Sequence, residues 1–232
     1  MSIWVTGDTH IPHDVKKLTS RYWPEGKNLS KTDYLIVCGD FGLIWKNIPD
    51  REEIYWTKWL TDKPWTTLFV DGNHENHHRL YNLKTINMLD SKIGVINDSI
   101  YHLKRGEIYN INDKTFFCMG GAMSIDTQHR IEGVSWWREE RPSYIEKEYG
   151  LTNLEKHNNK VDYVLSHTLP LNLRNEIKNV TYLGDKWYDD TCKYLEHIYL
   201  NIKFEKGFCG HWHVDQELKK YRVLYDDIIQ IY

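Results

Sequence analysis

The sequence has no long apolar stretch and no strong excess of charge of one sign. No run approaches the roughly 18 apolar residues that a membrane helix needs, and the N-terminus lacks the basic and apolar segments of a secretory signal. We therefore expect a soluble, cytoplasmic protein with no membrane partner. Lys and Arg number 30 against 33 Asp and Glu, so no broad basic surface is available for coating nucleic acid. A nuclease remains open, because bound divalent cations would add positive charge at the site itself.

Cysteine is also scarce. The four cysteines, Cys38, Cys118, Cys192 and Cys209, form no Cys-x-x-Cys pair. We expect buried, reduced thiols in a reducing compartment, with no disulfide partner. A chain of 232 residues can bury enough apolar surface to fold without disulfides. Because repeats and linker-like segments are absent too, we expect a single domain over residues 1–232.

Short apolar runs, each ended by a glycine-rich or polar turn, are the main structural signal. Such continuous runs are typical of strands that are buried on both faces. The five strongest are Ser2–Thr6, Tyr34–Cys38, Thr67–Val70, Asp162–Leu165 and Gly207–Cys209. Helical patterns cover Asp14–Arg21, Arg51–Leu60, Asn76–Leu83, Ser143–His157 and Tyr188–Leu200. Further β-like runs are Val95-Ile96, Ile100–Leu103, Glu107–Ile111, Thr115–Met119, Gln216–Leu218, Arg222–Tyr225 and Ile228–Ile231. This order predicts an α/β (α+β) fold, in which two packed sheets are flanked by helices.

Polar side chains follow each of the five strongest runs. They are Asp8, His10, Asp40, Asn73, His74, His167, His211 and His213. Because sites in open α/β sheets lie beyond the carboxyl ends of the strands, we expect these side chains to meet at one edge. Carboxylate, amide and imidazole ligands suit Mn, Fe, Zn or Ni. A carboxylate between two ions could bridge them, and Asp40 is the candidate.

The same residues carry a resemblance to a known family. The segments are Gly7-Asp8-Thr9-His10, Gly39-Asp40, Gly72-Asn73-His74-Glu75, Ser166-His167 and Gly210-His211-Trp212-His213. In this order, each after an apolar run, they resemble the five motifs of calcineurin-like metallophosphoesterases. The resemblance spans residues 7–213, which is nearly the whole chain.

The resemblance implies a four-layer α/β/β/α sandwich with two mixed sheets, and two divalent metal ions. One ion would be held by Asp8, His10, Asp40 and His213, and the other by Asp40, Asn73, His167 and His211. A hydroxide bridging the ions would attack phosphorus. His74, which would not bind metal, would give a proton to the leaving group. The substrate would be a phosphomonoester or a phosphodiester.

The substrate class stays open at this point. Protein Ser/Thr phosphatases of the superfamily continue the second motif as Gly-Asp-x-x-Asp-Arg-Gly, whereas here Gly39-Asp40 is followed by Phe41-Gly42-Leu43. The missing arginine counts against a phosphoprotein substrate, because bidentate arginine is the natural phosphate clamp. The alternatives are a nuclease or nucleic-acid-end phosphoesterase, a protein Ser/Thr phosphatase-like enzyme, and a non-catalytic metal-binding scaffold. The full set of metal-type residues argues against the scaffold.

Two further segments are candidates for contact with substrate. Gly120–Arg130 also follows a strand end, and either His129 or Arg130 could reach the phosphate beside Asn73. Alternatively, this segment is a structural turn with a surface charge. Trp136-Trp137 is either a lid that stacks on a base or an aromatic anchor for a loop.

Overall fold

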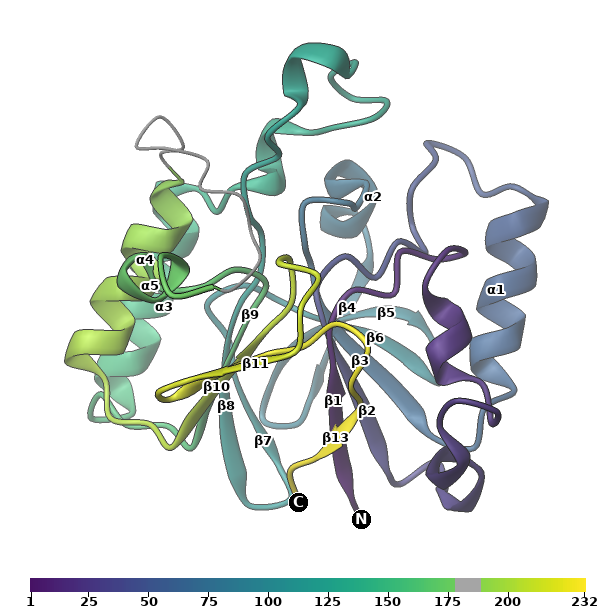
Figure 1. The fold of residues 1–232 in the computed structure, drawn as a ribbon, viewed down its shortest axis with the longest axis horizontal. Helices are drawn as coiled ribbons and strands as arrows, with labels where there is room; N and C mark the ends of the chain where they lie inside the picture. Colours follow the sequence, from purple (N-terminus) through teal and green to yellow (C-terminus); the bar gives the residue numbers. More distant parts are fainter. Residues whose placement is uncertain (178–188) are drawn as a thin grey trace.

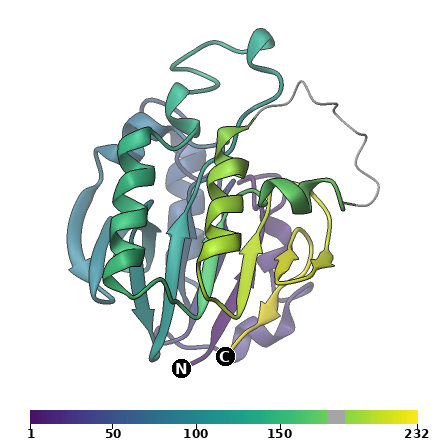
Figure 2. The same cartoon turned by 90° about the vertical axis from the view of Figure 1, so that its left-hand side faces the viewer.

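Two β-sheets face each other, and helices cover their outer faces (Figure 1). The structure, a computed structural model, describes residues 1–177 and 189–232. The two ends of the chain lie side by side at the edge opposite the long loops (Figures 1 and 2). The predicted four-layer α/β/β/α arrangement with two mixed sheets is confirmed.

The first sheet has seven strands in the order β13-β1-β2-β3-β6-β5-β4. The strands β1, β2, β3 and β6 are parallel, and the outer strands pair antiparallel. Their bounds are β1 Ile3–Thr6, β2 Tyr34–Cys38, β3 Thr66–Val70, β4 Lys84–Met88, β5 Ser91–Asn97, β6 Ile100–Leu103 and β13 Ile229–Gln230.

The second sheet has six strands in the order β11-β12-β10-β9-β8-β7. Its central strands β8, β9, β10 and β12 are parallel, and β7 and β11 are antiparallel at the two edges. Their bounds are β7 Ile108–Ile111, β8 Lys114–Met119, β9 Tyr163–Ser166, β10 Lys206–Cys209, β11 Gln216–Leu218 and β12 Tyr221–Val223.

Helices cover each sheet from outside. Figure 1 shows α1 on the right, over the first sheet, and α3, α4 and α5 on the left, while Figure 2 shows α3 and α5 lying across the second sheet. The α-helices are α1 Arg51–Thr61, α2 His77–Tyr81, α3 Tyr144–Lys156, α4 Leu171–Arg174 and α5 Asp190–Asn201. Short 3₁₀ turns are η1 Val15–Leu18, η2 Pro24–Asn28, η3 Thr127–His129 and η4 Arg138–Glu140.

Successive residues of the central strands point into different cores. On β2, Ile36 faces the core between the sheets, whereas Leu35 and Val37 face the core under α1. On β8, Phe116 faces the space between the sheets and Phe117 faces the helices α3 and α5. All five side chains are fully buried, and each such burial stabilises the fold by about 1.5–3 kcal/mol. Burial on both faces explains why these strands are continuous apolar runs rather than alternating ones.

The strongest predicted strands are confirmed to within one residue at each end. Tyr34–Cys38 and Ile100–Leu103 have the predicted bounds, and so does Gln216–Leu218. The four cysteines are buried and unpaired, as expected. The hairpin of β4 and β5 was largely missed, because β4 is a sheet edge whose residues are half-buried or exposed and which shows no apolar run.

The helix predictions hold where a capping signal was present. The Ser143 hydroxyl accepts a hydrogen bond from Glu146 N–H, and the Glu146 carboxylate accepts one from Ser143 N–H, which completes the predicted capping box at the start of α3. The helix predicted over Asp14–Arg21 is wrong, since only η1 forms there. Extended backbone at Thr19 ends this turn, and the Thr19 hydroxyl donates to Lys16 O, which is the local bonding that competes with helix. Tyr188 of the helix predicted over Tyr188–Leu200 lies outside the described residues, and α5 begins at Asp190.

None of the helices within the described residues combines the length and the apolar character required to cross a membrane.

The carboxylate of Asp33 links Ser2, directly before β1, to Ser30 in the turn before β2. From these contacts we predict that the stability of the protein depends on pH. The carboxylate accepts hydrogen bonds from Ser2 N–H at 2.6 Å and from Ser30 N–H at 2.7 Å. Partial burial opposes ionisation, but these bonds and those from the two hydroxyls outweigh it and lower the pKa of Asp33 to about 2. The folded-state pKa is depressed below its ordinary value of 3.8, so the stabilisation is present above pH 3.8 and is lost as the pH falls towards 2.

Urea denaturation should therefore show a fall in the free energy of unfolding between pH 4 and pH 2 that is smaller in Asp33→Asn than in the parent protein. An equal fall in both proteins would show that Asp33 carries none of this dependence.

Candidate metal centre

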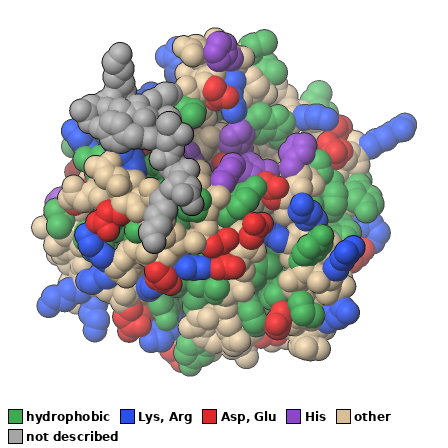
Figure 3. Space-filling model, in the orientation of Figure 1, with side chains coloured by type: hydrophobic (Ala, Val, Ile, Leu, Met, Phe, Trp, Pro, Cys, Tyr) green, Lys and Arg blue, Asp and Glu red, His purple; other side chains and the backbone are tan. Residues whose placement is uncertain are grey.

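The turns after five parallel strands meet at one edge of the two sheets. β1, β2 and β3 come from the first sheet, and β9 and β10 come from the second. On this face, histidine side chains gather in a hollow in the upper half of the molecule (Figure 3). The expectation that the polar turns converge is met in the structure by contacts between residues of both sheets.

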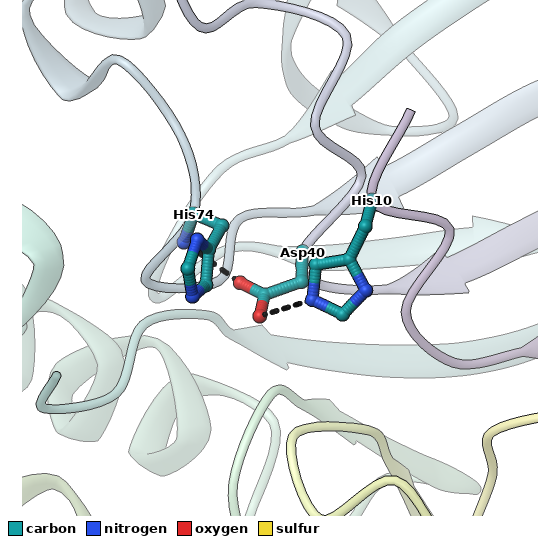
Figure 4. A group of neighbouring side chains, drawn as sticks. All are labelled: His10, Asp40 and His74. Carbon is teal, nitrogen blue, oxygen red and sulfur yellow. Dashed lines mark hydrogen bonds and ion pairs between the residues drawn. The ribbon is translucent and has the colours of Figure 1, made fainter. Parts of the chain in front are cut away.

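The carboxylate of Asp40 lies at the centre of these contacts. Its Oδ2 is 3.1 Å from Nε2 of His10, and its Oδ1 is 3.2 Å from Nε2 of His167. Oδ1 also accepts a hydrogen bond of 2.8 Å from the backbone N–H of His74, so the carboxylate lies between His10 and His74 (Figure 4). Each carboxylate oxygen thus faces a different imidazole.

Two groups of side chains with metal-ligand atoms share Asp40. One consists of His10, Asp40 and His74, and the other of Asp40, His167 and His211. Within each group the candidate ligand atoms lie within 4.8 Å of one another. Asp40 is thus common to both groups, and its role as a carboxylate that bridges two ions stays a prediction. His74 lies in the first group by distance, whereas the resemblance assigns it the part of proton donor rather than ligand.

The other predicted residues lie around these two groups. Oδ2 of Asp8 is 3.8 Å from Nε2 of His213, and Oδ1 of Asp8 is 3.7 Å from Nδ1 of His167. Oδ1 of Asn73 is 3.1 Å from Nε2 of His167. Asp8, Asp40, Asn73 and His167 are buried, whereas the side chain of His213 is about half exposed. The structure therefore brings together all eight residues that follow the five strands.

The far ring nitrogens of two histidines have their own partners. Nδ1 of His10 lies 2.8 Å from Oδ2 of Asp14, and Nδ1 of His167 lies 2.9 Å from the carbonyl oxygen of Cys38. Such partners fix the orientation of an imidazole and the nitrogen that carries its proton. In both rings Nε2 is consequently left facing Asp40.

Backbone strain is concentrated at the same turns. The φ angles are +33° at His10, +46° at Asp40, +70° at His211 and +50° at His213. This left-handed region costs roughly 1–2 kcal/mol for a residue with a Cβ atom. Strain of this kind persists where the surrounding structure holds it, and it is found preferentially at functional sites.

A chain of buried hydrogen bonds fixes Asn73. Its amide Nδ2 donates to Oγ of Ser124 at 3.1 Å, and Ser124 Oγ donates to the Glu140 carboxylate at 2.7 Å. Glu140 also accepts from Ser124 N–H at 2.8 Å. The amide oxygen of Asn73 is therefore the atom that faces His167. The predicted segment Gly120–Arg130 thus contacts the site through Ser124, a residue that the sequence did not single out.

The electrostatics of the hollow favour positive charge. Burial raises the pKa of Asp8, whereas the pKa of Asp40 is well below its ordinary value because the nearby imidazoles of His167 and His10 outweigh burial. Burial opposes protonation of these two imidazoles, but the carboxylates raise the pKa of His10 to about 9 and that of His167 to about 10. The negative charge of the buried carboxylates stabilises protonated imidazoles, and it would stabilise a bound cation in the same way.

Two further groups support the turns. Lys17, which is buried, donates to the carbonyl oxygens of Gly7 and Asp8 at 2.8 Å each. The carboxylate of Glu75 accepts from the N–H groups of Gly72 and Gly42, and its place in the third motif was a usable signal. Nothing in the local sequence pointed to Lys17, since an inward-facing lysine in a polar segment reads as a surface residue.

A buried ion pair lies directly behind the third motif. The Asp71 carboxylate accepts from Arg105 at 2.8 and 2.5 Å and lies 3.1 Å from Nε2 of His102. The Arg105 guanidinium also donates to the carbonyl oxygens of Glu139 and Glu140. It therefore ties the loop that carries Glu140 to the turn after β3, which carries Asn73.

His129 and Arg130, the two predicted substrate contacts, both have partners within their own loop. His129 is exposed and lies beside Gln128, while Arg130 pairs with Asp126 at 2.8 Å and donates to Ser135 O. Burial lowers the pKa of His74, the charge of Asp40 raises it, and the charge of Arg130 lowers it further.

Of the two tryptophans, Trp137 is 1% exposed and packs edge-on against Trp45, with ring centroids 5.2 Å apart. Trp45 in turn stacks on the His74 ring, with ring centroids 5.7 Å apart and an interplanar angle of 24°. The burial of Trp137 agrees with the interpretation that it anchors its loop. Trp45 lies between Trp137 and His74 and contacts both rings.

A comparison with protein families matches the model of the calcineurin-like phosphoesterases to residues 1–215. This chain belongs to the calcineurin-like phosphoesterase family. The match covers all five motifs, and the resemblance inferred from them is confirmed. Members of this family hydrolyse phosphoesters with the help of divalent metal ions, and the chain is accordingly a hydrolase of this general kind. Among curated proteins, a sequence search finds no significant match.

The residues present fit the divalent ions of the family. Carboxylate, imidazole and amide oxygen atoms converge without a thiolate, which suits Mn, Fe, Zn or Ni. The Nε2 atoms of His10 and His167 are oriented towards Asp40 by partners on their far side, as is usual for imidazoles that bind metal.

Replacing Gly39 by Ala should destabilise the protein strongly. A Cβ atom there would lie 2.1 Å from Nδ1 of His167, and φ is +86°. We expect a loss of about 1–2 kcal/mol from the backbone conformation and roughly 1–3 kcal/mol more from overpacking, measured by urea denaturation.

Gly133→Ala is the matched control, because its φ of +74° carries the same backbone cost but nothing lies within 4 Å of the added Cβ. Equal losses of stability in the two variants would mean that the contact with His167 is not what requires glycine.

Proposed function

We propose that this protein hydrolyses a phosphomonoester or phosphodiester with two divalent metal ions held on either side of Asp40. The observation that carries the proposal is that the two groups of ligand-type side chains share one buried carboxylate. One ion would be bound by Asp8, His10, Asp40 and His213, and the other by Asp40, Asn73, His167 and His211. When bound, such a pair of ions activates water as the nucleophile and neutralises charge on the phosphoryl oxygens.

The chain's own residues would orient the reactants. Asp14 holds the ring of His10, and the Cys38 carbonyl holds that of His167. Ser124 turns the oxygen of Asn73 towards the centre. Preorganised polar groups of this kind need no reorganisation during the reaction, and this is the main way in which enzymes stabilise transition states.

His74 would supply the proton to the leaving oxygen. Its backbone N–H donates to the Asp40 carboxylate, which fixes the main chain. Its ring stacks on Trp45 and packs edge-on against the ring of His10. An imidazole held at one end of the centre can protonate an alkoxide without contributing to the water attack. The missing arginine after Asp40 and the pairing of Arg130 with Asp126 leave the phosphate charge to the metal ions.

Metal add-back tests the proposal directly. We expect metal-stripped protein to be inactive and to regain hydrolysis with Mn, Fe, Zn or Ni, with two ions bound per chain by elemental analysis. His74→Asn should lower kcat by about 10²–10⁴ while leaving the metal content unchanged, because only general acid catalysis is lost. Asp40→Asn should lose both activity and metal. The ratio of p-nitrophenyl phosphate to bis-p-nitrophenyl phosphate turnover separates a monoesterase from a diesterase.

His78→Asn is the control for these variants, since His78 lies four residues beyond His74 but is largely exposed and faces Glu139. Failure of every metal to bind would refute the proposal. Two bound ions without hydrolysis of either ester would favour the non-catalytic scaffold.

Ser124→Ala should weaken metal binding without removing any ligand. The variant loses the acceptor that orients the Asn73 amide, and loss of such a supporting bond typically costs 10–100-fold in metal affinity. Competitive titration with a chromogenic chelator would measure the affinity. Ser135→Ala is the matched control, because within the described part of the chain the Ser135 hydroxyl bonds to Ile131 of the same loop and to no residue of the centre. An unchanged affinity in Ser124→Ala would show that the amide needs no outside support.

A further inference from the structure

A cavity of about 520 Å³ opens directly beside the proposed metal centre. It begins at His10, His74 and His213 and runs outwards between the turn after β1, the segment after β2 and the start of α1. Its size falls in the range of about 300–1,000 Å³ that is usual for small-molecule sites. None of the residues beyond the three histidines has a role in the metal chemistry proposed above, except that Asp14 supports His10.

We propose that this cavity binds the leaving group of the phosphoester, and that this group is a flat, uncharged aromatic one that carries no second phosphate. The inference rests on the proposed function and specifies the substrate class of the same site. It follows from the position of the cavity, from its apolar wall and from the charges at its rim.

The position of the cavity selects the leaving group. His74 is both the proposed proton donor and part of the cavity wall. A group that receives a proton from His74 leaves on that side, so whatever is bonded to the leaving oxygen extends into the cavity. The phosphoryl group itself stays at the end where His10 and His213 lie.

The wall of the cavity is apolar and aromatic. Trp45 and Trp56 line it together with Leu43, Ile11 and Pro12. Trp45 already stacks on the imidazole of His74, so the cavity wall continues an aromatic layer away from the proton donor. Flat rings stack on such surfaces, and each stacked base is worth about 1–3 kcal/mol.

The charges at the rim disfavour a second anionic group. Among the described residues that line the cavity, four are acidic and Lys46 is the sole Lys or Arg. Lys46 forms an ion pair with Asp50, and Glu53 binds Arg79 through both carboxylate oxygens at 2.6 Å. Glu52 adds an exposed carboxylate. A second phosphate would meet these carboxylates, and Lys46, the sole Lys or Arg on the described wall, is already paired with Asp50.

The first test compares substrates that share a phosphoryl group but differ in the leaving group. With manganese-loaded protein, we expect kcat/KM to be higher for 1-naphthyl phosphate and adenosine 5′-monophosphate than for glycerol 2-phosphate, and lower for adenosine 3′,5′-bisphosphate. If the enzyme is a diesterase, the same comparison is made between adenosine 2′,3′-cyclic phosphate and glycerol cyclic phosphate, and we expect the higher kcat/KM for the adenosine ester. The naphthyl and adenosine arms separate an aryl alcohol from a nucleoside as the natural group.

The second test removes the aromatic wall away from the chemistry. Trp56→Leu should lower kcat/KM for the aromatic esters by about 5- to 150-fold, which is the stated stacking energy expressed as a rate ratio. Glycerol 2-phosphate turnover should be unchanged. Trp59→Leu is the matched control, because Trp59 lies on the same helix and packs on the same core but does not line the cavity. Glu52→Lys should raise kcat/KM for the bisphosphate selectively.

Binding without catalysis separates this inference from the proposed function. Calorimetric titration of metal-free protein with adenosine should show binding that is weakened in Trp56→Leu but not in Trp59→Leu. If no ester is hydrolysed but adenosine binds in this way, the catalytic proposal fails and the cavity assignment stands. Equal kcat/KM for aromatic and glycerol esters, a preference for the bisphosphate, or an equal effect of Trp56→Leu on all substrates would overturn the assignment.

Discussion

The buried carboxylate of Asp40 is the group on which the arrangement of the site depends. A buried charge is strongly unfavourable unless partners compensate for it. Here the compensation comes from three other turns, which deliver the imidazoles of His10 and His167 and the backbone N–H of His74. These turns belong to both sheets, so the two sheets must keep a fixed position relative to each other. The left-handed backbone at His10 and Asp40 is part of the same requirement, because a relaxed turn would point these side chains elsewhere.

The four-layer fold meets that requirement by burying its central strands on both faces. Side chains between the sheets hold them together, and the opposite faces pack under the helices. The strands that carry the site are the parallel ones, whose carboxyl ends lie at a common edge. The polar turns thus begin where the buried strands end. Because protein interiors are close-packed and transmit strain, the strands hold these turns in fixed positions.

The sequence is most informative where structure and chemistry are both local. A continuous apolar run followed by a polar turn predicts a buried strand and the candidate residues that follow it, and all five such strands form with these polar residues in one place. The supporting contacts are not local. Ser124 meets Asn73 because the loops after β8 and β3 come together from different sheets, and Arg105 meets Asp71 because β6 pairs with β3 in the first sheet. No periodicity in the sequence records either pairing. Lys17 was missed for a related reason: its burial depends on carbonyl groups that the fold turns towards it.

The distribution of charge links the chemistry to the choice of substrate. Around the proposed centre, the described Lys and Arg side chains are engaged elsewhere: Lys17 bonds carbonyl oxygens, Lys46 pairs with Asp50, and Arg130 pairs with Asp126. In the proposed mechanism, the positive charge that neutralises a phosphoryl group would come from the metal ions, at one end of the cavity. Beyond them the wall is aromatic and its rim acidic. Under this proposal the site would neutralise one phosphate and offer the rest of the substrate an apolar surface, so that the loops around the centre would select the ester.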